Sequence, residues 1–396
     1  MKIKVLINRM LIAMDTVLAS AMLHRCKGKK NVVIAFQQVF GDAVILQSAL
    51  EAYTKLYSKD DDYHLKLLAR PSVAAFMKDV LELPEDLEIE TLDFKRFLED
   101  YAYYRKTVKK YRNQIDILIV PGTSLSAEIF ATASNAGRKI GLVRSMPVTL
   151  RQPSGIFSRL AYTETVVPEK NMMMLQRHRQ LLQYLGVRDY RAELPRLQKK
   201  TKIISEERYC VLCPGSSLKE KCWPIERYAE VADYIIENYD LTVHLCGGAE
   251  ETEYEKMLCS LSKYLNRIVS HIGKTNFSDW SAIVQHAALV LGNDSATMHL
   301  AAAARRPAIC IAGVYDKFQF FPYKVDYLAQ EDRLPVSVIR EKECQWCRTE
   351  GYYSGYGNPE CAKRIAKGLC TSCIDEITTE EVIALADQML QMEKNV

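Results

Sequence analysis

The sequence predicts an α/β protein built from two Rossmann-like, doubly wound domains. Three observations support this prediction. The chain has 396 residues, more than one ordinary domain needs, and 48% of them are hydrophobic, enough for two cores. In each half, short β-type apolar runs alternate with segments of helical periodicity, which is typical of parallel sheets covered by helices. No low-complexity tract interrupts this pattern, so we expect little disorder.

Residues 1–30 are expected to form an amphipathic helical extension. Its apolar positions are spaced by three or four: Ile3, Ile7, Met10, Met14, Leu18 and Met22. The helix could pack on the first domain, or it could lie on a membrane surface, which the flanking lysines and arginines favour. The sequence leaves both alternatives open.

The first Rossmann-like domain is expected at residues 31–170. A strand at 31–36 is followed by the Gly41-Asp42 turn and a helix at 43–56. The remaining elements expected here are strands at 64–68, 116–120 and 139–142 and helices at 72–81 and 96–111. Residues 171–207, a helix at 171–187 and a Lys-rich connector, form the domain boundary.

The second domain is expected at residues 208–376, followed by a closing helix within 377–396. Its strand at 209–213 leads into the loop Pro214-Gly215-Ser216-Ser217. The further elements are strands at 242–246, 289–291 and 308–312 and helices at 225–238 and 278–286, with another helix ending at 304. The domain therefore repeats the strand-helix alternation of the first.

Composition argues against several classes of protein. Lys and Arg number 53 against 49 Asp and Glu, a balance too even to indicate a nucleic-acid binder, although it does not exclude a local basic site. Five of the twelve cysteines cluster at 344–373 and seven are scattered singly, which favours a reducing compartment such as the cytoplasm. No apolar run reaches the length of a membrane span, and no A-x-A-like cleavage site precedes Arg25.

Chemistry-bearing residues follow the predicted strands, where open α/β sheets bind their ligands. No GxGxxG follows the first strand, so a dinucleotide is disfavoured. The 214–217 loop, with Lys219 and Lys221 beyond it, offers backbone amides, hydroxyls and cations for a diphosphate. Asp294-Ser295 begins a helix, where unpaired amides favour an anion. Each element alone could be an ordinary turn or helix cap.

The ordered motifs of the chain resemble the heptosyltransferases of glycosyltransferase family 9. The resemblance covers residues 31–390 and rests on these motifs: Gly41-Asp42, Arg138-Lys139-Ile140-Gly141, Pro214-Gly215-Ser216-Ser217, Lys221-Cys222-Trp223-Pro224, Gly247-Gly248 and Gly292-Asn293-Asp294-Ser295-Ala296-Thr297-Met298-His299. It implies a GT-B fold with a central cleft and an inverting transfer without a catalytic metal. The implied donor is a nucleoside-diphosphate heptose, usually ADP-activated. The implied acceptor is a lipopolysaccharide, surface polysaccharide or other glycan.

The resemblance also implies roles for individual residues. Asp42 would be the general base, although it could instead cap the helix at 43–56. Lys221, Ser216 and Ser217 would neutralise the departing diphosphate, unless Lys221 is merely solvated. The remaining donor contacts would come from Asp294, Ser295, Ala296, Thr297, His299 and one of Glu250 and Glu251, with Glu251 preferred. His299 could equally be a core histidine.

Two positions depart from the family pattern. Ala296 stands where the family usually has glycine, which would hinder a positive φ or a close approach of phosphate to the backbone. Ser48 replaces a common proline in the helix after Gly41-Asp42. These departures leave the acceptor and details of donor geometry open.

The C-terminal cysteines suggest a structural metal. Two C-x-x-C pairs and one cysteine between them could hold zinc or iron in a closed thiolate site: Cys344, Cys347, Cys361, Cys370 and Cys373. Reduced or disulfide-linked cysteines without an ion are the alternative.

Two other functions remain possible from the sequence. A nucleotide-sugar epimerase would share the two-domain fold but would act without an acceptor. A zinc-ribbon nucleic-acid-binding protein would use the cysteines, but basic and aromatic residues do not interleave around them.

Overall fold

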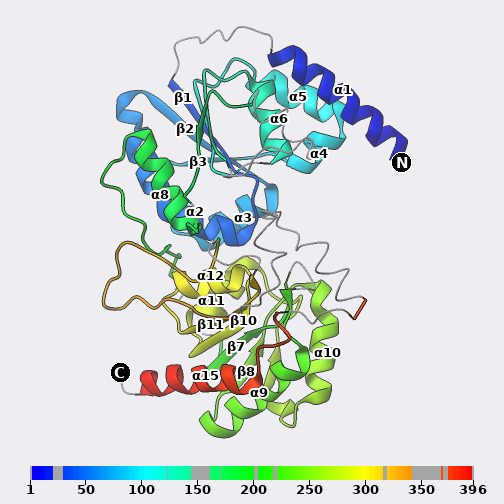
Figure 1. Cartoon of the computed structure of the whole chain (residues 1–396), viewed down its shortest axis with the longest axis vertical. Coiled ribbons are helices and arrows are strands. Elements are labelled where there is room, and N and C mark those ends of the chain that lie inside the picture. The colour runs from blue at the N-terminus through cyan, green and yellow to red at the C-terminus, as the bar shows by residue number, and fades with distance from the viewer. Residues whose placement is uncertain are drawn as a thin grey trace. The chain divides into compact units, whose positions relative to one another are not determined.

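The computed structural model describes residues 2–20, 30–122, 124–143, 161–169, 171–199, 204–216, 221–314, 319–340, 367–368 and 373–394. The chain divides into two compact units: Met1–Lys78 with Glu82–Ala192, and Asp79–Leu81 with Glu193–Val396. Each unit contains a six-stranded parallel sheet flanked by helices (Figure 1). The predicted class, α/β with two doubly wound sheets, is confirmed.

Unit 1 begins with α1 (Lys2–Ser20) and then alternates strands with helices. Its strands are β1 (Lys30–Ala35), β2 (Tyr63–Ala69), β3 (Glu88–Thr91), β4 (Ile117–Val120), β5 (Arg138–Leu142) and β6 (Glu164–Val166). Its other helices are α2 (Phe40–Leu56), α3 (Pro71–Val80), α4 (Phe94–Glu99), α5 (Tyr101–Tyr111), α6 (Leu125–Ser134) and α8 (Met174–Leu185), with a 3-10 turn at Lys59–Asp61. Because α8 packs on α2, the helix expected in the linker belongs to unit 1.

The strand order of unit 1 is β3-β2-β1-β4-β5-β6, so the winding reverses between β1 and β4. At such a reversal the loops after the two strands separate, and ligands of open sheets bind there. The β1 strand is buried from Val32 onward, and α2 follows it after only four residues. This short connection places the first turn of α2, with Asp42, at the carboxyl edge of the sheet.

Two helices of unit 1 differ from the sequence prediction. The helix expected at 43–56 begins at Phe40, so Asp42 lies in its first turn and Val39 is the N-cap residue. The single helix expected at 96–111 is divided into α4 and α5 at Asp100. The Asp100 side chain accepts the Tyr103 amide at 3.0 Å, which caps α5 and stabilises the new helix start.

Unit 2 repeats the alternation and ends on a long helix. Its strands are β7 (Tyr209–Cys213), β8 (Thr242–Leu245), β9 (Ile268–Ser270), β10 (Leu289–Asn293), β11 (Ala308–Ala312) and β12 (Val336–Ile339). Its helices are α9 (Ile225–Tyr239), α10 (Thr252–Leu261), α11 (Phe277–Gln285), α12 (Ala296–Ala303) and α15 (Thr379–Lys394), with 3-10 turns at Ala249–Glu251 and Leu265–Arg267.

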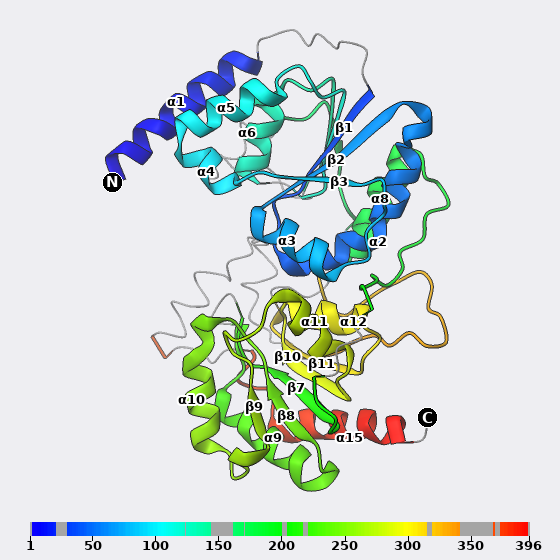
Figure 2. The same ribbon diagram turned by 180° about the vertical axis from the view of Figure 1, so that it is seen from behind.

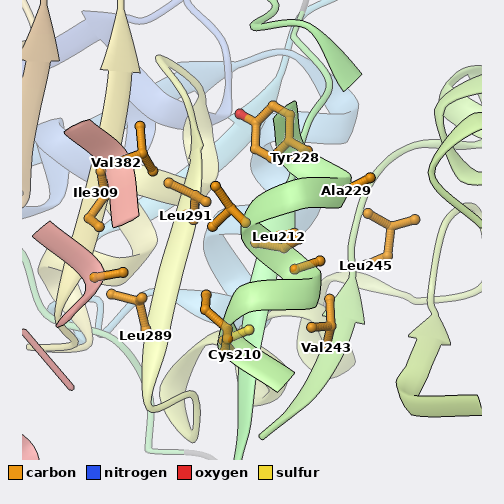
Figure 3. Close-up of a cluster of buried hydrophobic side chains, with 14 of the residues drawn as sticks. Cys210, Leu212, Tyr228, Ala229, Val243, Leu245, Leu289, Leu291, Ile309 and Val382 are labelled. Atoms are coloured by element: carbon orange, nitrogen blue, oxygen red, sulfur yellow. The ribbon is translucent and has the colours of Figure 1, made fainter. Parts of the chain in front are cut away.

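The core of unit 2 explains why these segments fold together. Alternate residues of β7, β8 and β10 point toward α9 and α15, among them Leu212, Leu245 and Leu291 (Figure 3). Tyr228 of α9 and Val382 of α15 complete this layer and are fully buried. Its apolar burial stabilises the sheet edge that carries the loops of the candidate site.

Candidate functional site

The strand order of unit 2, β12-β11-β10-β7-β8-β9, reverses between β7 and β10. The loop after β7 carries Pro214, Gly215 and Ser216, and the loop after β10 carries Asp294 and Ser295. The structure therefore brings together the 214–217 loop and Asp294-Ser295, the two elements that the sequence singled out for an anion, at the position where doubly wound sheets bind ligands.

Asn293 ties these two loops to each other. Its side-chain amide donates to the Pro214 carbonyl at 2.5 Å, and its Oδ1 accepts the Trp223 amide at 3.0 Å. The Trp223 indole in turn donates to the Ile377 carbonyl at 2.9 Å. Asn293 is completely buried, so both hydrogen bonds lie in a low-dielectric interior. In such an interior a hydrogen bond is electrostatically stronger than in water, and an unpaired polar group is costly.

Lys221 and Asp294 form a buried ion pair at the candidate site. Lys221 Nζ lies 3.5 Å from Asp294 Oδ2, and the two side chains are only 11% and 6% exposed. Lys221 is therefore not a solvated surface lysine. Burying both charges carries a desolvation cost, which the attraction between them offsets only in part.

The N-terminus of α12 directly follows this pair. Ser295 is the N-cap residue in an extended conformation, and its side chain makes no capping hydrogen bond. Its Oγ is buried and has no hydrogen-bond partner among the described residues. Ala296 is the first helical residue and is not among the described residues with positive φ, so alanine fits here without backbone strain.

His299 lies one turn into α12 and is 3% exposed. Its Nδ1 is 2.8 Å from the Tyr323 hydroxyl, and its ring stacks on Phe321. Burial, reinforced by the charge of Lys221, lowers the pKa of His299 to about 3. The imidazole is therefore neutral at physiological pH, which makes it a hydrogen-bonding group and not a cation.

The carboxylate of Glu251 lies over the ends of β7 and β8. A Cβ added at Gly215 or at Gly247 would meet a Glu251 oxygen at 1.9 or 2.0 Å, so only glycine allows this approach. Burial, then the charge of Glu250, raises the pKa of Glu251 to about 7, although a backbone hydrogen bond at Gly248 opposes the shift. Glu250 itself is exposed.

Asp42 belongs to unit 1. It is half-buried in the first turn of α2, where the partial positive charge of the helix terminus favours a carboxylate. Because Val39 is the N-cap residue, the alternative in which Asp42 caps a helix beginning at residue 43 is wrong.

A family model identifies the chain. The model for glycosyltransferase family 9 (heptosyltransferase) matches residues 104–346, more than half of the chain. The chain belongs to glycosyltransferase family 9. The match includes the β7 and β10 loops, the Lys221–Asp294 pair and α12, so the part of the candidate site in unit 2 lies inside the matched region, whereas Asp42 precedes it.

Two curated relatives of this family 9 chain are named as heptosyltransferases. Lipooligosaccharide heptosyltransferase 2 of Haemophilus influenzae is 31% identical over 159 residues, covering 39% of this chain and 44% of that protein. Lipopolysaccharide heptosyltransferase 3 of Escherichia coli is 23% identical over 199 residues, covering 46% of this chain and 57% of that protein. The chain thus spans about half the length of the curated relatives it matches.

Solved structures share the fold of this family 9 chain over nearly its whole length. The glycosyl transferase family 9 protein of Veillonella parvula has a TM-score of 0.65 at 17% identity, covering 94% of this chain and 99% of that one. The E. coli ADP-heptose lps heptosyltransferase II has a TM-score of 0.63 at 19% identity, covering 92% and 99%. The GT-B fold implied by the sequence motifs is confirmed.

The structure also shows which site residues the sequence missed or leaves outside the description. Asn293 stands within the α12 motif but received no role, although a polar residue ending a buried strand is a usable signal. Tyr323, 24 residues beyond its partner His299, had no such signal. Ser217 and four of the five metal candidates, Cys344, Cys347, Cys361 and Cys370, lie outside the described residues. Cys373 is described and is half-buried.

Proposed function

We propose that this family 9 chain is an inverting heptosyltransferase that moves heptose from ADP-heptose to a hydroxyl of a lipopolysaccharide, surface polysaccharide or other glycan. The observation that carries the proposal is the Lys221–Asp294 pair at the start of α12, at the ligand-binding edge of a family 9 sheet. The names of the two curated relatives support heptose as the sugar and a lipid-linked glycan as the acceptor.

The donor is held by unit 2. Lys221, Ser216 and Ser217 neutralise the diphosphate, together with the first amides of α12 at Ser295, Ala296 and Thr297. The unpartnered Ser295 hydroxyl is available to the same phosphate oxygens. Asp294, held by Lys221, accepts hydrogen bonds from sugar hydroxyls.

Neutral His299 contributes a hydrogen bond to this donor site. When the Tyr323 hydroxyl donates to Nδ1, the imidazole proton resides on Nε2 and is available to a phosphate oxygen. Because the pKa of His299 is lowered, the neutral imidazole predominates over the imidazolium at physiological pH.

Asp42 acts as the general base of the transfer. It accepts the proton of the acceptor hydroxyl as that oxygen bonds to the anomeric carbon of the donor. The bond between this carbon and the diphosphate breaks in the same step, ADP departs, and the anomeric configuration inverts. Lys221 and the amides of α12 stabilise the negative charge that develops on ADP. No step requires a metal.

A panel of nucleotide sugars tests the donor assignment. Thermal shift and calorimetry with ADP-, GDP-, UDP- and TDP-sugars should show selective binding of the ADP-sugar, with stabilisation that grows with its concentration. Selective binding of another nucleotide would replace ADP in the proposal, and binding of none would remove the donor site from unit 2.

Donor affinity is expected to rise with pH because of Glu251. The ionised carboxylate accepts hydrogen bonds from the ribose hydroxyls, and its pKa of about 7 means that it gains this form as pH rises through neutrality. From one pH unit below this pKa to one unit above it, the ionised fraction of Glu251 grows from about 0.1 to 0.9. Binding of the ADP-sugar should strengthen by up to about tenfold over this range.

Calorimetry with an ADP-sugar measures this profile, because a diphosphate esterified at both ends does not titrate in this range. The Glu251→Gln variant should bind with little pH dependence, whereas Glu250→Gln should keep the wild-type profile. A flat wild-type profile would exclude Glu251 from the ribose site.

We also propose a structural metal at Cys344, Cys347, Cys370 and Cys373, with Cys361 as a possible substitute. Elemental analysis of protein purified without a metal-affinity step should give about one zinc or iron per chain. The Cys344→Ser variant should lose this metal, and the exposed-surface variant Ser260→Ala should keep it. Substoichiometric metal in the wild-type protein would leave the cysteines as ordinary thiols.

The enzyme is proposed to work in the cytoplasm, at the inner face of the cell membrane, where it meets a lipid-linked acceptor. Among the described residues, no helix is long and apolar enough to cross a bilayer.

A further inference from the structure

Helix α1 is attached to unit 1 by its less apolar side. Ile12, Thr16 and Ala19 are at most 1% exposed where α1 lies along α4, α5 and α6 (Figures 1 and 2). The Thr16 hydroxyl is 2.7 Å from the Ile12 carbonyl and 3.0 Å from the Tyr104 hydroxyl. A buried hydroxyl with two partners fixes which side of the helix faces the unit.

Polar contacts along both margins of the buried side hold α1 in this orientation about its axis. The Asn8 amide donates to the Glu99 carbonyl at 2.7 Å, and Arg9 pairs with the Glu99 carboxylate at 2.9 Å. Two turns beyond Asn8 on the same margin, the Tyr101 hydroxyl donates to Asp15 at 3.0 Å, whereas Arg9 lies on the opposite margin. The helix therefore cannot roll to bury its other side without losing all these bonds.

That other side is a continuous apolar stripe, which we call the outer face of α1. At 100° per residue its members fall on the side opposite Ile12 and Thr16. They are Ile3, Leu6, Ile7, Met10, Met14, Val17 and Leu18, each between 51% and 75% exposed. An ordinary surface helix buries its apolar stripe, whereas α1 exposes it, and exposed patches of this kind mark an interaction surface.

Exposed cations lie on α1 and on the two helices α4 and α5 that pack beside it. Lys4 on α1, Lys95 on α4, and Lys106 and Lys109 on α5 are exposed and form no ion pair within the described part of the chain. The acidic groups nearby are already engaged: Asp15 with Tyr101, Glu99 with Arg9, and Asp100 with Arg96 and the α5 amides. The helices α1, α4 and α5 therefore carry uncompensated positive charge on their exposed sides.

We infer that the outer face of α1 docks unit 1 on an anionic lipid surface. The apolar side chains enter the region between headgroups and acyl chains, and the lysines of α1, α4 and α5 bind lipid phosphates. A second copy of the chain fits this surface less well, because pairing two copies through α1 would bring two positively charged helix groups together. The surface is a property of the fold and does not depend on the proposed transfer reaction.

Vesicle binding of the full-length chain tests this inference. Co-sedimentation with vesicles of phosphatidylglycerol and phosphatidylethanolamine should exceed that with phosphatidylcholine vesicles and should weaken as salt rises. The triple variant Ile7→Gln, Met10→Gln, Met14→Gln should lower the partition coefficient by roughly tenfold or more. The pair Lys106→Gln, Lys109→Gln should lower it by a similar factor only on anionic vesicles.

The matched control replaces exposed apolar side chains of unit 2 by glutamine. Leu261 and Leu265 are 47% and 57% exposed, so the pair Leu261→Gln, Leu265→Gln should leave vesicle binding unchanged. All variants alter exposed side chains and should keep the wild-type thermal midpoint and circular dichroism.

Three results would overturn the inference. Wild-type protein could fail to bind anionic vesicles, or the triple variant could bind them as well as the wild type does. Light scattering could also show a dimer that the triple variant dissociates while neither protein binds vesicles, which would assign the outer face to a second copy. Loss of transferase activity bears only on the proposed function.

Discussion

Replacing Asp42 by asparagine is expected to lower turnover by about 10²–10⁴-fold, the usual contribution of a general base. Asparagine is nearly isosteric but cannot accept the proton of the acceptor hydroxyl. Donor affinity should stay within about twofold of the wild type, because the proposed donor contacts all come from unit 2.

The structure predicts that this variant folds. Asp42 lies in the first turn of α2 and is not its N-cap residue, so losing its charge costs about 0.3–1 kcal/mol through the helix dipole. Asp93→Asn is a matched control because Asp93 caps α4 by accepting the Arg96 amide at 2.9 Å, and asparagine caps equally well. Steady-state kinetics on both variants, with donor calorimetry, separates the roles. Near wild-type turnover of Asp42→Asn would eliminate the base assignment.

Removing Lys221 is expected to have the second largest effect, on donor binding. A charge-assisted contact to phosphate contributes about 1.5–3 kcal/mol, so Lys221→Ala should weaken ADP-sugar binding at least about tenfold. The variant also leaves Asp294 buried without its cation, and breaking such a pair typically costs about 3–5 kcal/mol of folding stability.

A second variant separates these two losses. The double variant Lys221→Met, Asp294→Asn removes both charges of the buried pair. Its thermal midpoint should therefore recover, while ADP-sugar binding stays weak. Lys256→Ala, on the exposed side of α10, should change neither quantity. An unchanged dissociation constant for Lys221→Ala by calorimetry would remove Lys221 from the donor site.

The sequence predicted the order of elements well because each half carries its own local periodicity. It placed the β7 and β10 loops at strand ends, and parallel topology then brought the loops together without further information. It could not predict that Asn293 joins the two loops, because that bond depends on the three-dimensional register of β7 and β10. The Tyr323 partner of His299 depends on tertiary packing in the same way.

Local errors have equally specific physical causes. The division between α4 and α5 follows from one side chain, since Asp100 caps a new helix within a stretch of continuous helical periodicity. Periodicity also identified the apolar stripe of α1, but it did not show whether the stripe faces unit 1 or the solvent. The spacing of Ile7, Met10 and Met14 is the same whether the stripe is buried or exposed, and only the bonds of Thr16 and Asn8 decide it.

The most direct test of the central claim is product analysis by mass spectrometry after incubation with ADP-heptose and a heptose-deficient lipopolysaccharide core. We expect an acceptor heavier by one heptose residue, one ADP released per transfer, and an inverted anomeric linkage by NMR. Donor incubated alone should stay unchanged. An isomerised nucleotide sugar formed without acceptor, or a transferred sugar whose anomeric configuration is retained, would contradict the central claim.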